Sequence, residues 1–167
     1  MIENQRDFVP DAFDVPGGLT GDGFRLEPLG PAHNVRDLAA WSASIAHIRA
    51  TPGFSGQGWP PIGGMTEAEN LVDLERHAKD FAGRRGFTYS VLEGADEVIG
   101  CVYLYPARQE HEHEHDRVPG RESVRVRVSS WVRADRAYLD APLHRAVSQW
   151  LAEAWPFEPG RVDYAPR

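Results

Sequence analysis

The chain has 167 residues, with 18 Lys and Arg against 25 Asp and Glu, and its formal net charge is -7 at pH 7. The length fits a single domain, the acidic balance argues against a nucleic-acid partner, and no apolar run is long enough to span a membrane. The amino terminus lacks an export signal, so we expect a cytoplasmic protein, and the single cysteine, Cys101, excludes an internal disulfide.

The chain begins with a segment of turn-forming residues. Residues 1–23 are rich in Asp, Gly and Pro, and we expect them to form an arm ahead of a single domain over residues 24–167. Apolar and polar residues alternate over residues 24–29, which predicts a strand. Apolar residues then recur at helical spacing over residues 34–48, so an amphipathic helix is expected to follow this strand.

A long Gly- and Pro-rich loop follows this helix and carries two large aromatic residues, Phe54 and Trp59. Loops longer than a simple connection often line a site. Thr66 and Glu69 have the spacing of a capping box, in which each side chain binds a backbone amide at the start of a helix. The sequence therefore predicts a second helix that begins after Thr66 and ends at the Gly-Arg-Arg-Gly segment 83–86.

The rest of the chain is mainly typical of strands. Alternation with a period of two predicts a hairpin over residues 87–106 and a further strand over residues 123–133. Asp140 as a cap, with Pro142 in the first turn, predicts a third helix, and residues 161–165 are typical of a last short strand.

The order strand, helix, helix, three strands, helix, strand predicts an α/β (α+β) fold. Consecutive strands pair antiparallel, whereas the final strand-helix-strand passage favours a right-handed parallel crossover. We therefore expect a mixed, mostly antiparallel sheet flanked by helices.

This element order, together with the passage WVRADRAYLDAPLHRAV at residues 131–147, resembles the GNAT superfamily of N-acetyltransferases from Phe24 to Tyr164. The resemblance implies a short member of the family that is truncated after the fifth strand. It implies acetyl-CoA as co-substrate, with its pantetheine arm along one strand and its pyrophosphate on the loop and helix that follow. A helix amino terminus suits a phosphate because it offers free N–H groups and a partial positive charge.

The resemblance assigns donor binding to residues of this passage. They are Trp131, Val132 and Arg133 on the strand, and Arg136, Ala137, Tyr138, Leu139, Asp140 and Ala141 on the loop. Leu139 departs from the family pattern because it replaces a glycine, whose positive φ and lack of a side chain let a phosphate approach the backbone. Asp140 also departs from it, since a carboxylate at a helix start repels a phosphate and is expected to cap the helix itself.

The chemistry of the family implies further site residues. A late tyrosine often protonates the leaving thiolate, which makes Tyr164 the catalytic candidate; a buried aromatic residue of the core is the alternative. Phe54, Trp59, Tyr103 and Tyr105 are candidates for a pocket that binds the acceptor, which is a small amine or a protein amino group. An ordinary aromatic core face is the alternative for these residues.

Two alternatives to a transferase remain open: a binding or assembly module with the GNAT fold, and a metal-responsive protein that uses the histidines of residues 110–116. Leu139, Asp140 and the missing carboxy-terminal elements favour a GNAT fold without acyl-CoA chemistry, which serves as a binding or assembly module. The exposed sheet edge expected after Tyr164 leaves room for a homodimer.

The string EHEHEHD at residues 110–116 is the other unusual feature. On an extended segment His111, His113 and His115 point to one side, at a spacing that suits a divalent metal. A solvated connection between strands is the alternative, and we predict no functional metal site.

Overall fold

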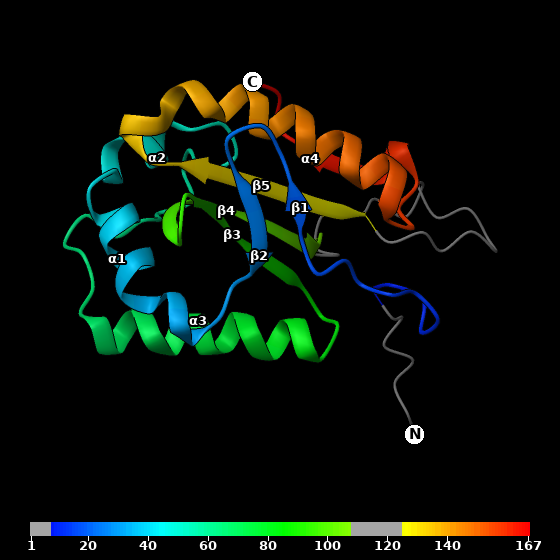
Figure 1. Cartoon of the computed structure of the whole chain (residues 1–167), viewed down its shortest axis with the longest axis horizontal. Coiled ribbons are helices and arrows are strands. Elements are labelled where there is room, and N and C mark those ends of the chain that lie inside the picture. Colours follow the sequence, from blue (N-terminus) through cyan, green and yellow to red (C-terminus); the bar gives the residue numbers. More distant parts are fainter. Residues whose placement is uncertain (1–7, 108–124) are drawn as a thin grey trace.

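The structure of the chain is a computed structural model that describes residues 8–107 and 125–167 (Figure 1). The histidine string and its candidate ligands His111, His113 and His115 lie outside the described residues. None of the helices in the described residues is long and apolar enough to cross a membrane.

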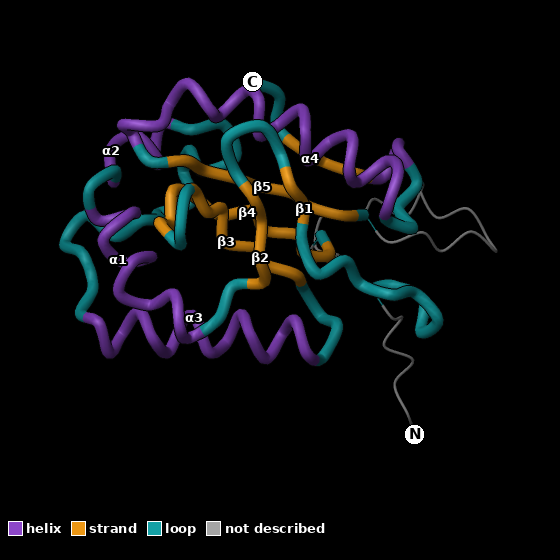
Figure 2. The backbone as a smooth tube through the Cα atoms, in the orientation of Figure 1, coloured by secondary structure: helices purple, strands orange, loops and turns teal. Residues whose placement is uncertain are grey.

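The centre of the molecule is a six-stranded sheet whose strands lie in chain order (Figure 2). The strands are β1 (Leu19–Thr20), β2 (Arg25–Pro28), β3 (Phe87–Glu93), β4 (Glu97–Pro106), β5 (Val126–Val132) and β6 (Val162–Tyr164). All neighbouring pairs are antiparallel except β5 and β6, which are parallel. The mixed, mostly antiparallel sheet predicted from the sequence is thus confirmed, with β1 as an additional short edge strand.

Helices cover both faces of this sheet. They are α1 (Asn34–Ser42), α2 (Ile45–Ala50), α3 (Glu67–Ala82) and α4 (Asp140–Ala154), with short 3-10 turns η1 (Pro31–His33), η4 (Ala134–Leu139) and η5 (Pro159–Arg161). Helix α3 lies on one side of the sheet and α4 on the other (Figure 1). Helix α4 makes the crossover between the parallel strands β5 and β6.

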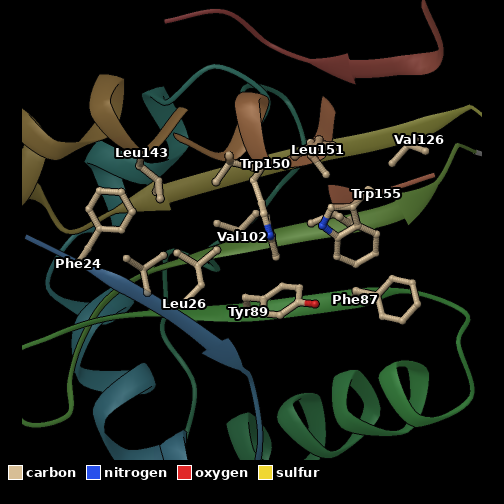
Figure 3. Packing of buried hydrophobic residues seen from close by; sticks show 14 of the residues in the cluster. Phe24, Leu26, Phe87, Tyr89, Val102, Val126, Leu143, Trp150, Leu151 and Trp155 are labelled. Carbon is tan, nitrogen blue, oxygen red and sulfur yellow. The ribbon is translucent and has the colours of Figure 1, made fainter. Parts of the chain in front are cut away.

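The core between α4 and the sheet is rich in aromatic residues. Side chains of α4, such as Trp150 and Leu151, lie beside Tyr89 and Val102 of the strands (Figure 3). Burial of each large apolar side chain contributes about 1.5–3 kcal/mol to folding. Phe8 and Val9 are buried in the same core, so part of the expected amino-terminal arm packs on the domain.

The opposite face of the sheet packs against α1, α2 and α3 and contains a buried polar network. The Asp37 carboxylate accepts hydrogen bonds from Asn70 Nδ2 at 3.1 Å and, more weakly, from Cys101 Sγ at 3.6 Å. Trp41 Nε1 donates to Asn70 Oδ1 at 3.1 Å. Burial raises the pKa of Asp37 from 3.8 to about 6, because the charged carboxylate loses its hydration.

The capping box at the start of α3 agrees with the sequence prediction, whereas the first predicted helix is divided in two. The capping box is confirmed, since Glu69 N–H donates to Thr66 Oγ1 at 3.1 Å and Thr66 N–H donates to Glu69 Oε1 at 3.0 Å. The single helix predicted over residues 34–48 is wrong, because Ser44 is not helical and separates α1 from α2. The Ser44 hydroxyl accepts a hydrogen bond from Ala134 N–H at 2.9 Å, so this break is linked to a distant segment.

Candidate functional site

The short strand β6 runs beside only the first part of β5. The pairs extend from Val126 with Val162 to Val128 with Tyr164, whereas β5 continues to Val132. Arg133 N–H donates to Ile99 O of β4, so the alternate residues Ser130 and Val132 direct their backbone groups away from β4. Beyond Val128, β5 therefore turns backbone groups toward a space that β6 does not fill.

The side chain of Arg167 occupies this divergence of β5 and β6. Its Nη2 donates to Ser130 O at 2.8 Å, and its Nη1 donates to Ala165 O at 2.9 Å. The guanidinium also reaches the loop after α2, where Nη1 donates to Pro52 O at 3.3 Å. Only 6% of the Arg167 side chain is exposed, so the chain fills the divergence with a residue of its own.

Arg167 is held by Asp140 at the start of α4. Arg167 Nε donates to Asp140 Oδ2 at 2.7 Å, while Asp140 Oδ1 is buried and has no hydrogen-bond partner in the part of the chain that the structure describes. The prediction that Asp140 caps α4 is wrong, because Leu139 occupies the cap position and no side chain caps the helix. The ion pair with Arg167 directs the Asp140 carboxylate away from the helix amides.

Tyr164 lies at the point where the two strands part. Its hydroxyl is within 2.5 Å of Ser130 Oγ, and its ring is 4.1 Å from the ring of His144. Burial raises the pKa of Tyr164 to about 12, so its hydroxyl stays protonated at neutral pH. The candidate predicted from the sequence is thus next to the divergence, in a position from which it can donate a proton.

The loop expected to bind pyrophosphate has its basic residues paired with acids. Arg133 binds Asp135 at 2.8 Å and Glu97 at 2.7 Å, and Arg136 binds Glu93 at 2.6 Å. The Arg136 guanidinium lowers the pKa of Glu93, which therefore stays ionised. Any phosphate bound here would compete with these carboxylates.

The remaining residues of that loop form the 3-10 turn η4. Ala134 N–H donates to Ser44 Oγ, and Asp140 N–H donates to Ala137 O. The Leu139 side chain is buried, whereas Tyr138 is 70% exposed. Of the loop amides expected to face a phosphate, that of Asp140 is therefore already engaged, as is that of Arg136, which donates to Arg133 O.

On the other face of β5 lies a cavity of about 300 Å³, which we call the α3–β5 cavity. It is lined by Gly53, Phe54, Gln57, Trp59, Met65, Asp73, Arg76, His77, Tyr103, Arg127 and Ser129. Ser129, on this face, is adjacent in the chain to Ser130, whose carbonyl binds Arg167. The cavity and the divergence are therefore separated by a single strand.

Three of the four residues predicted to line an acceptor pocket lie around this cavity. The ring of Trp59 is 5.8 Å from that of Phe54 and 6.4 Å from that of Tyr103. Trp131, expected near the donor, directs its side chain to this face and donates from Nε1 to Tyr103 Oη at 3.0 Å. Tyr105 does not line the cavity and instead binds His77 and Asp80.

The sequence analysis did not identify His77 of α3. Its ring lies 5.6 Å from that of Tyr103, and its Nδ1 is 2.8 Å from Tyr105 Oη and 3.1 Å from Thr88 Oγ1. Burial lowers the pKa of His77, so the imidazole is neutral at pH 7. The signal in the sequence was a polar residue on the buried stripe of α3, since Asn70, Leu74 and His77 recur at helical spacing.

A second hollow, of about 420 Å³, lies between α1 and η4. Its charged lining residues include Arg133, which is paired with both Glu97 and Asp135. In residues 8–107 and 125–167 there is no group of three His, Cys, Asp or Glu side chains that could hold a metal ion. The α3–β5 cavity is therefore the more suitable place for a small polar molecule.

Comparison with known proteins identifies the fold. No family model and no curated protein matches the sequence. The microcin C7 self-immunity acetyltransferase MccE, in complex with acetyl-CoA and AMP, matches with a TM-score of 0.57 and 11% identity, over 83% of this chain and 67% of that chain.

Two further solved structures match this chain. The ribosomal-protein-S5-alanine acetyltransferase from Vibrio fischeri gives a TM-score of 0.50 and 15% identity over 84% of this chain and 69% of that chain. A protein from Bordetella pertussis assigned to the GNAT acetyltransferase family gives a TM-score of 0.52 and 15% identity over 83% of this chain and 74% of that chain. The chain therefore has the fold of GNAT acetyltransferases, as the sequence predicted.

Proposed function

We propose that this protein is an acetyl-CoA-dependent N-acetyltransferase that acts on a small amine or a protein amino group. The observation that carries the proposal is the early end of the β5–β6 pairing at Val128 and Tyr164, with an aromatic cavity on the other face of β5. Solved proteins of the same fold include an acetyltransferase in complex with acetyl-CoA. Acetyl-CoA as the donor is part of this proposal.

The donor would bind along the second half of β5. Ser130 and Val132 direct backbone groups to that side, and Arg133 and Arg136 are the basic residues of the following turn. The present arrangement fits the donor only in part, because Arg167 occupies the divergence and both arginines are paired with carboxylates. Donor binding therefore requires the Arg167 side chain to leave Ser130.

The transfer itself needs few groups. An amine must be neutral when it attacks the thioester carbonyl, some group must take its proton, and the thiolate must be protonated as it leaves. We assign the last role to Tyr164, since its high pKa keeps its hydroxyl protonated and its contact with Ser130 holds it at the divergence.

Thermal unfolding with and without millimolar acetyl-CoA tests this proposal, together with release of free thiol in the presence of a panel of amines. A ligand at a hundred times its Kd stabilises the folded state by about 2.7 kcal/mol. We expect stabilisation by acetyl-CoA that is weakened in Arg136→Ala and retained in Arg145→Ala, since Arg145 is an exposed residue of α4 away from the loop.

Failure to bind acetyl-CoA would refute the transferase proposal. If neither the natural protein nor Arg167→Ala binds acetyl-CoA or releases thiol, the transferase proposal is wrong. The filled divergence and the paired arginines would then favour the alternative of a GNAT-fold binding or assembly module.

A further inference from the structure

We propose that the α3–β5 cavity binds the acceptor as a small amine that carries an anionic group, with the amine at His77 Nε2 and the anion at Arg127. This inference rests on the proposed acetyltransferase function and narrows it to a substrate class. It follows from the size of the cavity, the hydrogen bonds of His77, the charge of Arg127 and the aromatic walls.

The size of the cavity favours a small molecule. Its volume of about 300 Å³ is at the lower end for ligand pockets in proteins, which range over about 300–1,000 Å³. The rings of Phe54, Trp59 and Tyr103 provide apolar walls for the body of such a ligand. An acceptor of the size of an amino acid fits this space better than a folded protein surface.

The hydrogen bonds of His77 define which ring nitrogen is free. Tyr105 Oη donates its only proton to Asp80 Oδ2 at 2.9 Å. The Tyr105 oxygen must then accept its contact of 2.8 Å from His77, so the proton of the neutral ring is on Nδ1. Nε2 is left with a free lone pair, and it has no hydrogen-bond partner in the described part of the chain.

Several charged and titratable groups face His77. Asp73, Arg76 and Asp80 lie on its own helix, and the nearest Asp73 oxygen is 3.9 Å from Nε2, beyond a hydrogen bond. From the sheet it is faced by Tyr103 and Tyr105 of β4. Burial outweighs these charges and lowers the pKa of His77, which leaves a neutral imidazole able to take a proton.

Arg127 supplies a positive charge on the strand side of the cavity. The other arginine of the lining, Arg76, is paired with Asp73 at 2.6 Å. Arg127 is exposed and has no hydrogen bond or ion pair with any residue in ranges 8–107 and 125–167. A guanidinium that is unpaired in this way suits a carboxylate or phosphate on the ligand.

The acceptor loses one proton to solvent and becomes a neutral amine, whose nitrogen attacks the thioester carbonyl of acetyl-CoA. A C–N bond forms, and the attacking nitrogen gives its second proton to His77 Nε2. The C–S bond then breaks with its electron pair on sulfur, and the thiolate takes a proton from Tyr164, which regains one from solvent. His77 returns its proton to solvent, so the products are an acetamide, free coenzyme A and one released proton.

Two matched amines test the anion site. Phenylalanine and phenethylamine share an aromatic body and differ in a carboxylate, and their kcat/KM values are compared with acetyl-CoA as donor. We expect a preference for phenylalanine of about tenfold, the usual effect of one hydrogen bond to a charged group. Arg127→Ala should abolish the preference, whereas Arg145→Ala should leave the preference unchanged. A preference for phenethylamine, or one that survives Arg127→Ala, would overturn the proposal.

His77→Gln tests the proton acceptor, since glutamine is polar but is not a base. We expect kcat to fall by about 10²–10⁴-fold with little change in KM, and the decline of kcat/KM at acidic pH to disappear. His47→Gln, at a half-buried position of α2, is the matched control and should behave as the natural protein. Loss of activity through KM alone, or an unchanged acidic decline, would contradict the role of His77.

Two measurements on the unmodified protein separate this inference from the proposed function. Nitrogen NMR of the histidine side chains reports the protonated ring nitrogen, and a proton on Nε2 of His77 would overturn its assignment. Calorimetric titration with phenylalanine and phenethylamine, without any donor, reports the anion site even if no acetyl transfer occurs. Equal binding of the two amines, or binding of neither, would count against the cavity as a site for anionic amines.

Discussion

Replacing Arg167 with alanine removes the side chain that fills the divergence of β5 and β6. The variant loses the ion pair of 2.7 Å to Asp140 and the hydrogen bond of 2.8 Å to Ser130 O. With Arg167 present, the Asp140 side chain is only 21% exposed, and its other oxygen has no hydrogen-bond partner among the described residues. Breaking a buried ion pair on one side costs about 3–5 kcal/mol.

Because some water reaches Asp140, we take the lower end of this range, about 3 kcal/mol. For a chain of this size each kcal/mol corresponds to a Tm change of about 2–4 °C, so Arg167→Ala should lower the Tm by about 6–12 °C. The double variant with Asp140→Asn and Arg167→Met removes both charges and should recover part of this loss of Tm. Differential scanning calorimetry measures both effects, with Arg145→Ala as the control.

The same variant should bind acetyl-CoA more tightly. Contacts that a ligand must break weaken its apparent affinity tenfold for every 1.4 kcal/mol, so about 3 kcal/mol sets an upper limit near 100-fold. Calorimetric titration of both proteins with acetyl-CoA measures the difference. If Arg167→Ala is as stable as the natural protein and its affinity for acetyl-CoA is unchanged, Arg167 does not hold this position in solution and the reasoning fails.

Three further predictions concern other contacts. The pKa of Asp37 rises from 3.8 to about 6 on folding, so its contribution to stability is full below pH 4 and is lost as the pH rises through 6. Urea unfolding at pH 4.5 and 7.5 should show a decline in stability of about 2 kcal/mol that Asp37→Asn removes, and the same decline in both proteins would refute it. Thr66→Ala removes the cap of α3 and should cost about 1 kcal/mol in the same assay, whereas no loss would mean that the capping box contributes nothing. Glu93→Gln frees Arg136 and should strengthen acetyl-CoA binding in calorimetry, and weaker binding would argue against a phosphate at Arg136.

Much of the architecture could be predicted because it depends on local patterns. Alternation along Phe87–Glu93 and Val126–Val132 and the capping box at Thr66 each reflect interactions between near neighbours in sequence. At the helix break, in contrast, the Ser44 side chain binds Ala134, a residue 90 positions away. No local pattern contains that information.

The candidate site was less predictable for the same reason. Asp140 has the residue type of a helix cap, but its carboxylate is drawn to Arg167, 27 positions later in the chain. The aromatic residues around the α3–β5 cavity were identified because they stand out by type. His77 was not, since its role depends on Tyr105 and Asp80, whose positions relative to one another only the folded sheet and helix define.

The position of Cys101 has a practical consequence for studying this protein. The thiol is fully buried beside Asp37, and burial raises its pKa well above the ordinary value, so the reactive thiolate is scarce while the chain is folded. A chromogenic disulfide reagent should therefore report coenzyme A released in an assay with little background from the enzyme. In denaturant the same reagent would label Cys101, the only cysteine of the chain, and so follow global opening without an introduced probe.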